Sequence, residues 1–251
     1  MSLPLSELTR HLDTLLRVAE IPDELNAING LQLEASTEIS TLACAVDASE
    51  AAIDEATRRG AQLLLVHHGL FWAGNRPVVG PHARKLKKCF AAGLSTYSAH
   101  APLDVHPELG NNAGIVRALG LAPDGGFGRY QGMDIGLAAS CDLSFAELLE
   151  RLRGSVGEVR AFGAGPERIR RLAVVSGGAG GYAAKAARAG FDAFLTGEAA
   201  HYTAIDAEEL GIHLLLAGHY RTETFGVKAL GERLASELGL TTFFIEHDTG
   251  L

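Results

Sequence analysis

The sequence has few cysteines and no long apolar run, and each scarcity excludes a class of protein. Its three cysteines, Cys44, Cys89 and Cys141, show no paired spacing, so they predict neither a disulfide framework nor a cysteine-ligated metal site. No apolar run approaches the ~20 residues of a membrane span. The N-terminus, MSLPLSELTRHLDTLL, carries early charges and lacks the apolar run of a signal peptide. We therefore expect a soluble cytoplasmic protein without a membrane partner.

Basic residues are also scarce. The chain has 22 Lys and Arg against 30 Asp and Glu, which gives a net charge of −8. Binding to nucleic acid needs clustered cations that contact phosphates, so the charge argues against nucleic acid as a partner and against a ring that encloses it. The densest basic run, Arg84–Lys88, falls in a helical pattern and is interpreted as a solvated helix face.

Short apolar runs alternate with helical patterns along most of the chain. Strands are predicted at 41–46, 62–66, 94–99, 171–175, 193–196 and 213–217, and helices at 6–18, 47–59, 81–92, 111–119, 144–152 and 226–238. This alternation predicts an α/β protein with largely parallel sheets. A glycine-rich break at Gly125–Gly128 divides the chain into predicted domains 1–125 and 126–251.

The two halves resemble each other. An offset of 130 aligns Leu42 and Ala43 with Leu172 and Ala173, and an offset of 119 aligns His100 with His219 and Asp104 with Glu223. We interpret this as an internal duplication that gives two related α/β lobes with a pseudo-twofold axis. The carboxyl ends of the strands in the two lobes are expected to meet at a cleft. The alternative is a chance similarity, because βαβ units resemble each other by class.

Residues of the metal-ligand type follow four predicted strands. They are His67 and His68, His100 with Asp104, Glu198 with His201, and His219 with Glu223. Open α/β sheets bind ligands at the carboxyl ends of their strands. Imidazoles and carboxylates without a thiolate suit Zn, Mn, Fe, Co or Ni, and five or six of them suit two bridged ions. The alternative is that the His–acid pairs are ordinary surface pairs on helices.

Adjacent residues in a regular strand point to opposite faces. His67 and His68 can therefore both bind metal only if the strand has ended there, and Gly69 permits such a turn.

The run Ser176–Gly181 follows a predicted strand and opens a helical pattern. Its spacing, Gly178-x-Gly180-x-x-Ala183, fits a dinucleotide-binding fingerprint only superficially. An anion or phosphate that rests on the backbone amides is the preferred interpretation.

Five motifs together resemble one known family. They are NGLQ at 29–32, HHGLFW at 67–72, HAPLD at 100–104, TGE with a following His at 196–201, and GHYRTE at 218–223. In this combination and order they resemble the NIF-three-like dinuclear metal centre family. Its bacterial members are of the YbgI type and are often labelled GTP cyclohydrolase I type 2 homologs. The match covers almost the whole chain.

The resemblance implies a toroidal homohexamer and two divalent metal ions per chain, in the cleft between the two lobes. It implies metal ligands at His67, His68, Asp104, His219 and Glu223, with Glu223 or Asp104 as the bridge. It also places His100 and Glu198 nearby, as further ligands, as groups that orient ligands, or as catalytic groups that transfer protons.

We therefore expect a metal-dependent hydrolase that acts through a metal-bound hydroxide. Its small-molecule substrate would be a nucleotide, as for a GTP cyclohydrolase, or another small compound. The alternative is a non-catalytic metal-binding protein, such as a metallochaperone or a regulatory scaffold. An open coordination position would distinguish the enzyme from a structural or storage site.

Overall fold

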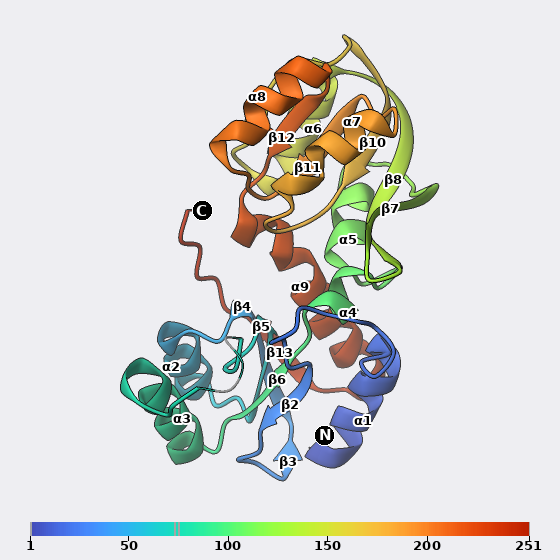
Figure 1. Ribbon diagram of the computed structural model, residues 1–251. Coiled ribbons are helices and arrows are strands. Elements are labelled where there is room, and N and C mark those ends of the chain that lie inside the picture. Colours follow the sequence, from blue (N-terminus) through green and yellow to red (C-terminus); the bar gives the residue numbers. More distant parts are fainter. Residues whose placement is uncertain (1, 73, 75, 251) are drawn as a thin grey trace. The chain divides into compact units, whose positions relative to one another are not determined.

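The computed structural model describes residues 2–72, 74 and 76–250, which form two compact units (Figure 1). The first unit comprises Met1–Leu103 and Gly226–His247, and the second comprises Asp104–Phe225 and Asp248–Leu251. This division differs from the predicted boundary after residue 125. The reason is that residues 111–118 pack into the core of the second unit, whereas residues 241–244 extend the sheet of the first.

The first unit is built on a five-stranded sheet. In spatial order its strands are β13 (Thr241–Phe244), β4 (Thr41–Asp47), β5 (Leu63–His68), β6 (Ser95–Ser98) and β2 (Gly30–Leu33). The first four are parallel, and β2 is antiparallel to β6. A separate pair, β1 (Leu3–Pro4) and β3 (Glu38–Ile39), forms a two-stranded sheet. The carboxyl ends of β5 and β6 therefore meet at one edge of the main sheet.

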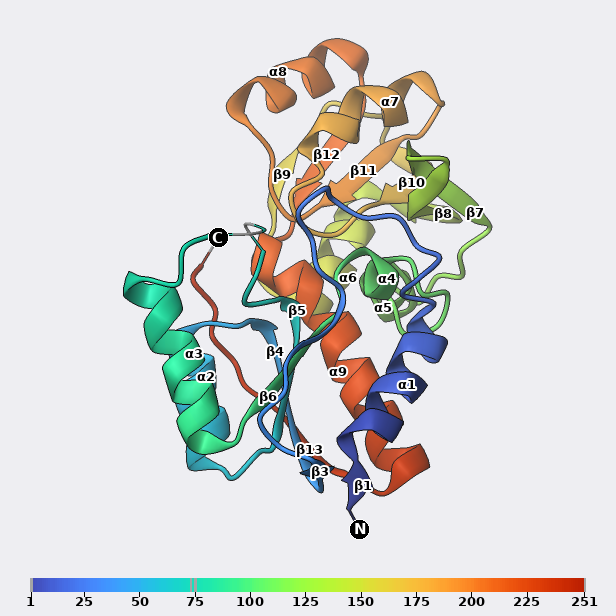
Figure 2. The same cartoon turned by 60° about the horizontal axis from the view of Figure 1, so that its bottom comes forward.

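Helices cover both faces of this sheet (Figures 1 and 2). Side chains that alternate along β4 and β5, such as Ala43 and Leu64, pack with α2 (Glu50–Arg58) and α3 (Gly80–Ala92). The opposite face is covered by α1 (Leu5–Leu16) and by the first-unit part of α9 (His219–Leu238). Gly231 of α9 approaches Cys44 so closely that a Cβ there would lie 2.7 Å from the cysteine sulfur.

The second unit is built on a six-stranded sheet. In spatial order its strands are β7 (Gly125–Tyr130), β8 (Met133–Ser144), β10 (Arg168–Val174), β11 (Ala193–Thr196), β12 (His213–Leu216) and β9 (Arg160–Phe162). Strands β10, β11 and β12 are parallel, and the flanking strands are antiparallel. Figure 1 shows this sheet with helices on both faces.

Successive side chains of β10 and β11 point to opposite faces of this sheet and belong to two separate hydrophobic cores. Leu172 and Leu195 pack with α5 (Asn111–Ala118) and α6 (Phe145–Val156). Ala173 and Phe194 pack with α7 (Ala183–Arg188) and α8 (His201–Leu210) on the other face. The predicted α/β class, with parallel strands at the centre of each sheet, is confirmed.

The central strands of the two units repeat the same register. Leu42 pairs with Leu63 in the first unit and Leu172 pairs with Ala193 in the second, so the offset of 130 relates both members of the pair. The third strands pair through Ser95 and His213, which are offset by 118 rather than 119. By this register His100 matches the residue before His219. The backbone therefore agrees with the similarity detected in the sequence, with a shift of one residue at the ligand motif, and the duplication stays an interpretation of that agreement.

Helix α9 begins earlier than the pattern at 226–238 predicted. It runs over 20 residues from His219, so the motif GHYRTE contributes its first turn. The boundary between the two units falls within this helix, after Phe225. In the described ranges no helix, α9 included, is both long and apolar enough to cross a membrane.

Candidate metal centre

Three imidazoles gather at the carboxyl ends of β5 and β6. The ring centroid of His67 lies 4.8 Å from that of His68 and 4.9 Å from that of His100, and the other two centroids are 5.6 Å apart. Each ring offers a nitrogen, and these nitrogens lie within 4.8 Å of one another. We call His67, His68 and His100 the imidazole cluster, and its spacing suits ligands of a common metal ion.

Each ring of the imidazole cluster is held through Nδ1. His67 Nδ1 lies 2.9 Å from the carbonyl oxygen of Ala99, which can only accept a hydrogen bond, so Nδ1 carries the proton and Nε2 the lone pair. His68 Nδ1 lies 3.0 Å from Asp47 Oδ1, and His100 Nδ1 lies 2.7 Å from Asp23 Oδ1. Metal-binding histidines are commonly oriented in this way, with Nδ1–H bonded to a carbonyl or carboxylate.

The expectation that the strand ends before His67 is wrong. β5 extends through His68, which pairs with Asp47 of β4. Pairing with β6 on the other side stops at Val66 and Ser98. The two histidines therefore stand in the last residues of the strand, where only one neighbour continues, and their rings are tilted by 51° and remain close.

Asp23 and Asn29 support His100, and neither was predicted as part of the site. Asn29 accepts a hydrogen bond from the His100 amide at 2.8 Å and donates to Asp23 Oδ2 at 2.7 Å. Burial acts to raise the pKa of Asp23, but the hydrogen bonds and charge of His100, with the bond from Asn29, keep it below its usual value. Asp23 is therefore a carboxylate that orients His100.

Gln32, the last residue of the NGLQ motif, supports the turn after His68. Its Oε1 accepts a hydrogen bond from the Leu70 amide at 2.7 Å, and its Nε2 donates to the carbonyl of Ile28 at 2.7 Å. A Cβ at Gly69 would lie 2.3 Å from the Gln32 amide group, so any other residue there would displace the Gln32 side chain. The motif that carried the family resemblance thus has a structural role beside the histidines.

A second group of ligand-type residues surrounds His219 in the first turn of α9. His219 Nε2 lies 3.1 Å from Glu223 Oε1, four residues further on, and its Nδ1 lies 2.8 Å from Glu198 Oε1. Glu223 is only 3% exposed. We call Glu198, His219 and Glu223 the His219 cluster. The predicted geometry, with His219 and Glu223 on one face of a helical turn, is confirmed.

The carboxylates of the His219 cluster favour a positive charge between them. The hydrogen bond with Glu223, against the opposing effect of burial and with further help from Glu198, raises the pKa of His219 to about 9. At neutral pH this histidine is therefore an imidazolium in the metal-free protein. A divalent cation bound at the same place would supply the positive charge and displace a proton.

Asp104 is held by two donors on one oxygen. Asn111 Nδ2 and Ser176 Oγ donate to Asp104 Oδ1 at 2.8 and 3.0 Å. Ser176 is followed by Gly177, which faces Glu223: a Cβ at Gly177 would lie 2.3 Å from Glu223 Oε1, and its φ is +65°. The Ser176–Gly177 segment therefore contacts both carboxylates that the family resemblance named as candidate bridges.

Half of the backbone amides in the run Ser176–Gly181 bond to side chains within the protein. The amides of Ser176, Gly177 and Ala179 donate to the side chains of Asn112, Thr222 and Thr196. These three donors are used within the protein, so only the other amides of the run could bind an anion, and the expected anion site stays a prediction. The glycines also permit close packing, since Gly177 and Gly178 lie against Glu223 and Glu198.

His201 does not join the candidate site. It begins α8 and is exposed, and within the described ranges it makes no hydrogen bond or ion pair with Glu198. The other predicted site residues fall into the imidazole cluster, the His219 cluster, and Asp104.

The donor set fits a transition-metal centre. Imidazole nitrogens and carboxylate oxygens are the ligands that Zn, Mn, Fe, Co and Ni accept. The thiols are poor alternatives: burial raises the pKa of Cys44 to about 12, which disfavours its thiolate form. The fold and these clusters together define an α/β protein with His and Glu groups suited to bind metal at the carboxyl ends of parallel strands.

Comparison with known proteins identifies the family. Residues 3–250 match the model of the family described as Duf34/NIF3 (NGG1p interacting factor 3), and the chain belongs to this family. A relative from Deinococcus radiodurans, called GTP cyclohydrolase 1 type 2 homolog, is 42% identical over 248 residues, which cover 98% of this chain and 94% of the relative.

Two solved structures are similar over nearly the whole chain. One is described as protein ybgI of unknown function; it is 35% identical, has a TM-score of 0.92, and the match covers 99% of this chain and 100% of that one. The other, TTHA1606 from Thermus thermophilus, is 36% identical with a TM-score of 0.90 and the same coverage. The family resemblance seen in the five motifs is therefore confirmed.

The close approach of Gly177 to Glu223 predicts the effect of a small substitution. We expect Gly177→Ala to displace the Glu223 carboxylate, because the new methyl group and the positive φ both oppose the native geometry. The metal content of the purified variant, measured by elemental analysis, should fall severalfold. Gly181→Ala is the matched control, since no atom lies within 4 Å of a Cβ there. Equal metal content in the two variants would contradict the prediction.

Proposed function

We propose that the protein is a metal-dependent hydrolase with a dinuclear metal centre. The proposed ligands are His67, His68, Asp104, His219 and Glu223. The observation that carries the proposal is that His67 and His68, two neighbouring imidazoles, are each oriented through Nδ1 by an oxygen acceptor. An ordinary surface histidine needs no such arrangement, whereas a metal ligand does.

Bound divalent ions would lower the pKa of a bound water and stabilise a leaving oxygen, which is the usual chemistry of hydrolytic two-metal sites. The chain supplies the groups that move protons. His100 can take a proton at Nε2, because Asp23 at Nδ1 stabilises the imidazolium that results. Glu198 is the second proposed proton carrier, since its carboxylate reaches the His219 ring.

The relatives' names support a nucleotide as the substrate. The relative from Deinococcus radiodurans and one from Pyrococcus horikoshii, which is 40% identical, are both called GTP cyclohydrolase 1 type 2 homolog. Cleavage of GTP by such an enzyme is hydrolytic, which agrees with the metal chemistry proposed above. The competing hypothesis is a metal-binding protein without turnover.

Metal content tests the ligand assignment. We expect about two ions per chain in the wild type, purified without added metal or chelator, by analogy with two-metal hydrolytic sites. Glu223→Gln should lose much of this metal, because a buried anionic ligand becomes a neutral amide of the same shape. Glu209→Gln makes the same change at an exposed position of α8 and should retain the metal. A wild type without metal after reconstitution would refute the proposal.

Asp23→Asn separates catalysis from metal binding. The variant keeps the shape of the side chain but removes the charge that stabilises a protonated His100. We expect its metal content to be unchanged and its kcat for GTP hydrolysis to fall by about 10²–10⁴-fold, the usual range for a general acid–base group. KM should change little, and the pH dependence of kcat should shift. Absence of turnover in the metal-loaded wild type would instead favour the non-catalytic hypothesis.

We also propose that the chain assembles as a homohexamer, as the family resemblance implies. Size-exclusion chromatography with light scattering should then give about 158 kDa, six times the chain mass of 26.4 kDa. A mass of one or two chains at micromolar concentration would count against the hexamer, and it would leave the metal proposal intact.

A further inference from the structure

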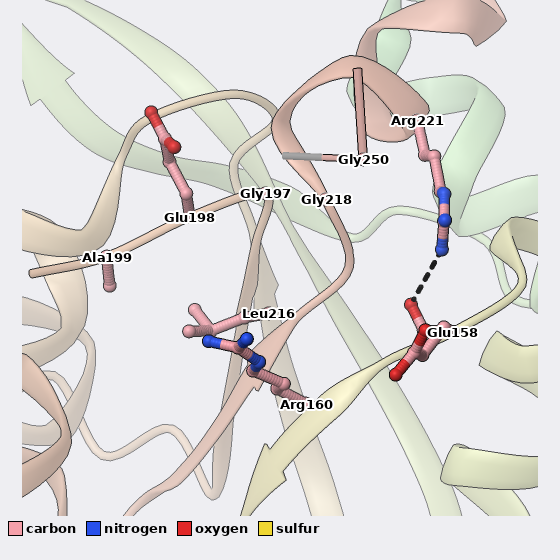
Figure 3. A pocket seen from close by; sticks show the side chains of 9 residues that line it. All are labelled: Glu158, Arg160, Gly197, Glu198, Ala199, Leu216, Gly218, Arg221 and Gly250. Atoms are coloured by element: carbon pink, nitrogen blue, oxygen red, sulfur yellow. Dashed lines mark hydrogen bonds between the residues drawn. The ribbon is translucent and has the colours of Figure 1, made fainter. Parts of the chain in front are cut away.

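A pocket of about 270 Å³ opens beside the His219 cluster, in the second unit (Figure 3). It lies at the carboxyl ends of β11 and β12, where Gly197 and Gly218 form part of its wall. Glu198 lines it as well, and the same side chain contacts His219. A molecule in this pocket would therefore be in direct reach of a proposed metal-ligand cluster.

Two arginines line the pocket, and they differ in what they contact. Arg221 donates to Asp248 Oδ2 at 3.1 Å and to the carbonyl of Glu158 at 3.4 Å, so its charge is paired (Figure 3). Arg160, on β9, is exposed, and within the described ranges its guanidinium makes no ion pair or hydrogen bond. Figure 3 shows its side chain extended beneath Leu216, away from Glu158. Arg160 therefore offers an unneutralised planar donor group to the pocket.

We propose that Arg160 forms an anion subsite that binds a phosphate group of the substrate. The proposal rests on the proposed function, because it assigns the reacting part of the same substrate to the nearby metal ligands. Guanidinium presents several N–H donors in a plane and binds phosphate oxygens in pairs. Three other charged residues line the pocket. Glu198 and Arg221 are paired with His219 and Asp248, and Glu158 lies on the Arg221 side, away from the Arg160 guanidinium.

The size of the pocket limits what it can hold. At about 270 Å³ it is just below the ~300–1,000 Å³ of sites that enclose a whole drug-sized ligand. It suits one polar end of a substrate better than a complete nucleotide. The inferred substrate class is therefore a small phosphorylated molecule, whose phosphate contacts Arg160 while the rest extends past Glu198.

Calorimetric binding of two probes to the metal-loaded protein tests the subsite. GTP carries phosphates, guanosine does not, and wild type should bind GTP more tightly. Arg160→Gln should weaken GTP binding by about tenfold or more, the effect of losing a charge-assisted contact, and leave guanosine binding unchanged. Arg160→Lys should weaken GTP binding by an intermediate factor, because lysine keeps the positive charge but lacks the planar set of N–H donors. Arg188→Gln removes the same charge from an exposed position on α7 and should have no effect.

The outcomes separate this inference from the proposed function. Arg160→Gln should contain as much metal as the wild type, since Arg160 is not a proposed ligand. Unchanged GTP affinity in Arg160→Gln, or a wild type that binds GTP no better than guanosine, overturns the subsite even if metal and turnover are present. A metal-free, inactive wild type whose preference for GTP still depends on Arg160 would refute the hydrolase and keep the anion subsite.

Discussion

The orientation of the imidazoles is the constraint on which the candidate site depends. A histidine can bind metal through Nε2 only if its proton is kept on Nδ1, and each ring of the imidazole cluster has an oxygen at that atom. The acceptors come from different places: the backbone after β6, the end of β4, and the loop after α1. The parallel sheet brings these places together, so the chemistry of three side chains is fixed by the arrangement of the strands around them.

The second unit has a similar backbone but presents a different set of proposed metal ligands. Its central strands repeat the register of the first unit, yet two of its proposed ligands, His219 and Glu223, sit on the first turn of a helix. The third, Asp104, is a second carboxylate. The buried carboxylate of Glu223 needs positive charge nearby, which the His219 imidazolium supplies in the absence of metal. Gly177 lets the backbone approach the Glu223 carboxylate closely, and Gly197 packs against the backbone of Gly177 and His219. One architecture thus presents imidazole nitrogens in one unit and mainly carboxylate oxygens in the other.

The sequence predicted what local patterns encode and missed what depends on distant partners. Apolar runs followed by histidines identified β5, β6 and the histidines at their ends, because burial and strand ends are local properties. Asp23 was missed since its partner, His100, is 77 residues away. Helix α8 was missed because its buried positions are the small residues Thr203 and Ala207, which give no apolar stripe. The unit boundary was misplaced because a C-terminal strand, β13, returns to pair with β4.

The position of Trp72 has a practical consequence. It is the only tryptophan in the sequence, and its ring contacts His68 and His100 edge-on, with centroids 4.9 and 4.4 Å away. Its emission therefore comes from a single place, beside two of the imidazoles. Paramagnetic ions such as Co²⁺ or Ni²⁺ bound there would quench that light, whereas Zn²⁺ would not by this route. The fluorescence of Trp72, followed during a metal titration, therefore distinguishes a bound paramagnetic ion from bound Zn²⁺ without an added dye.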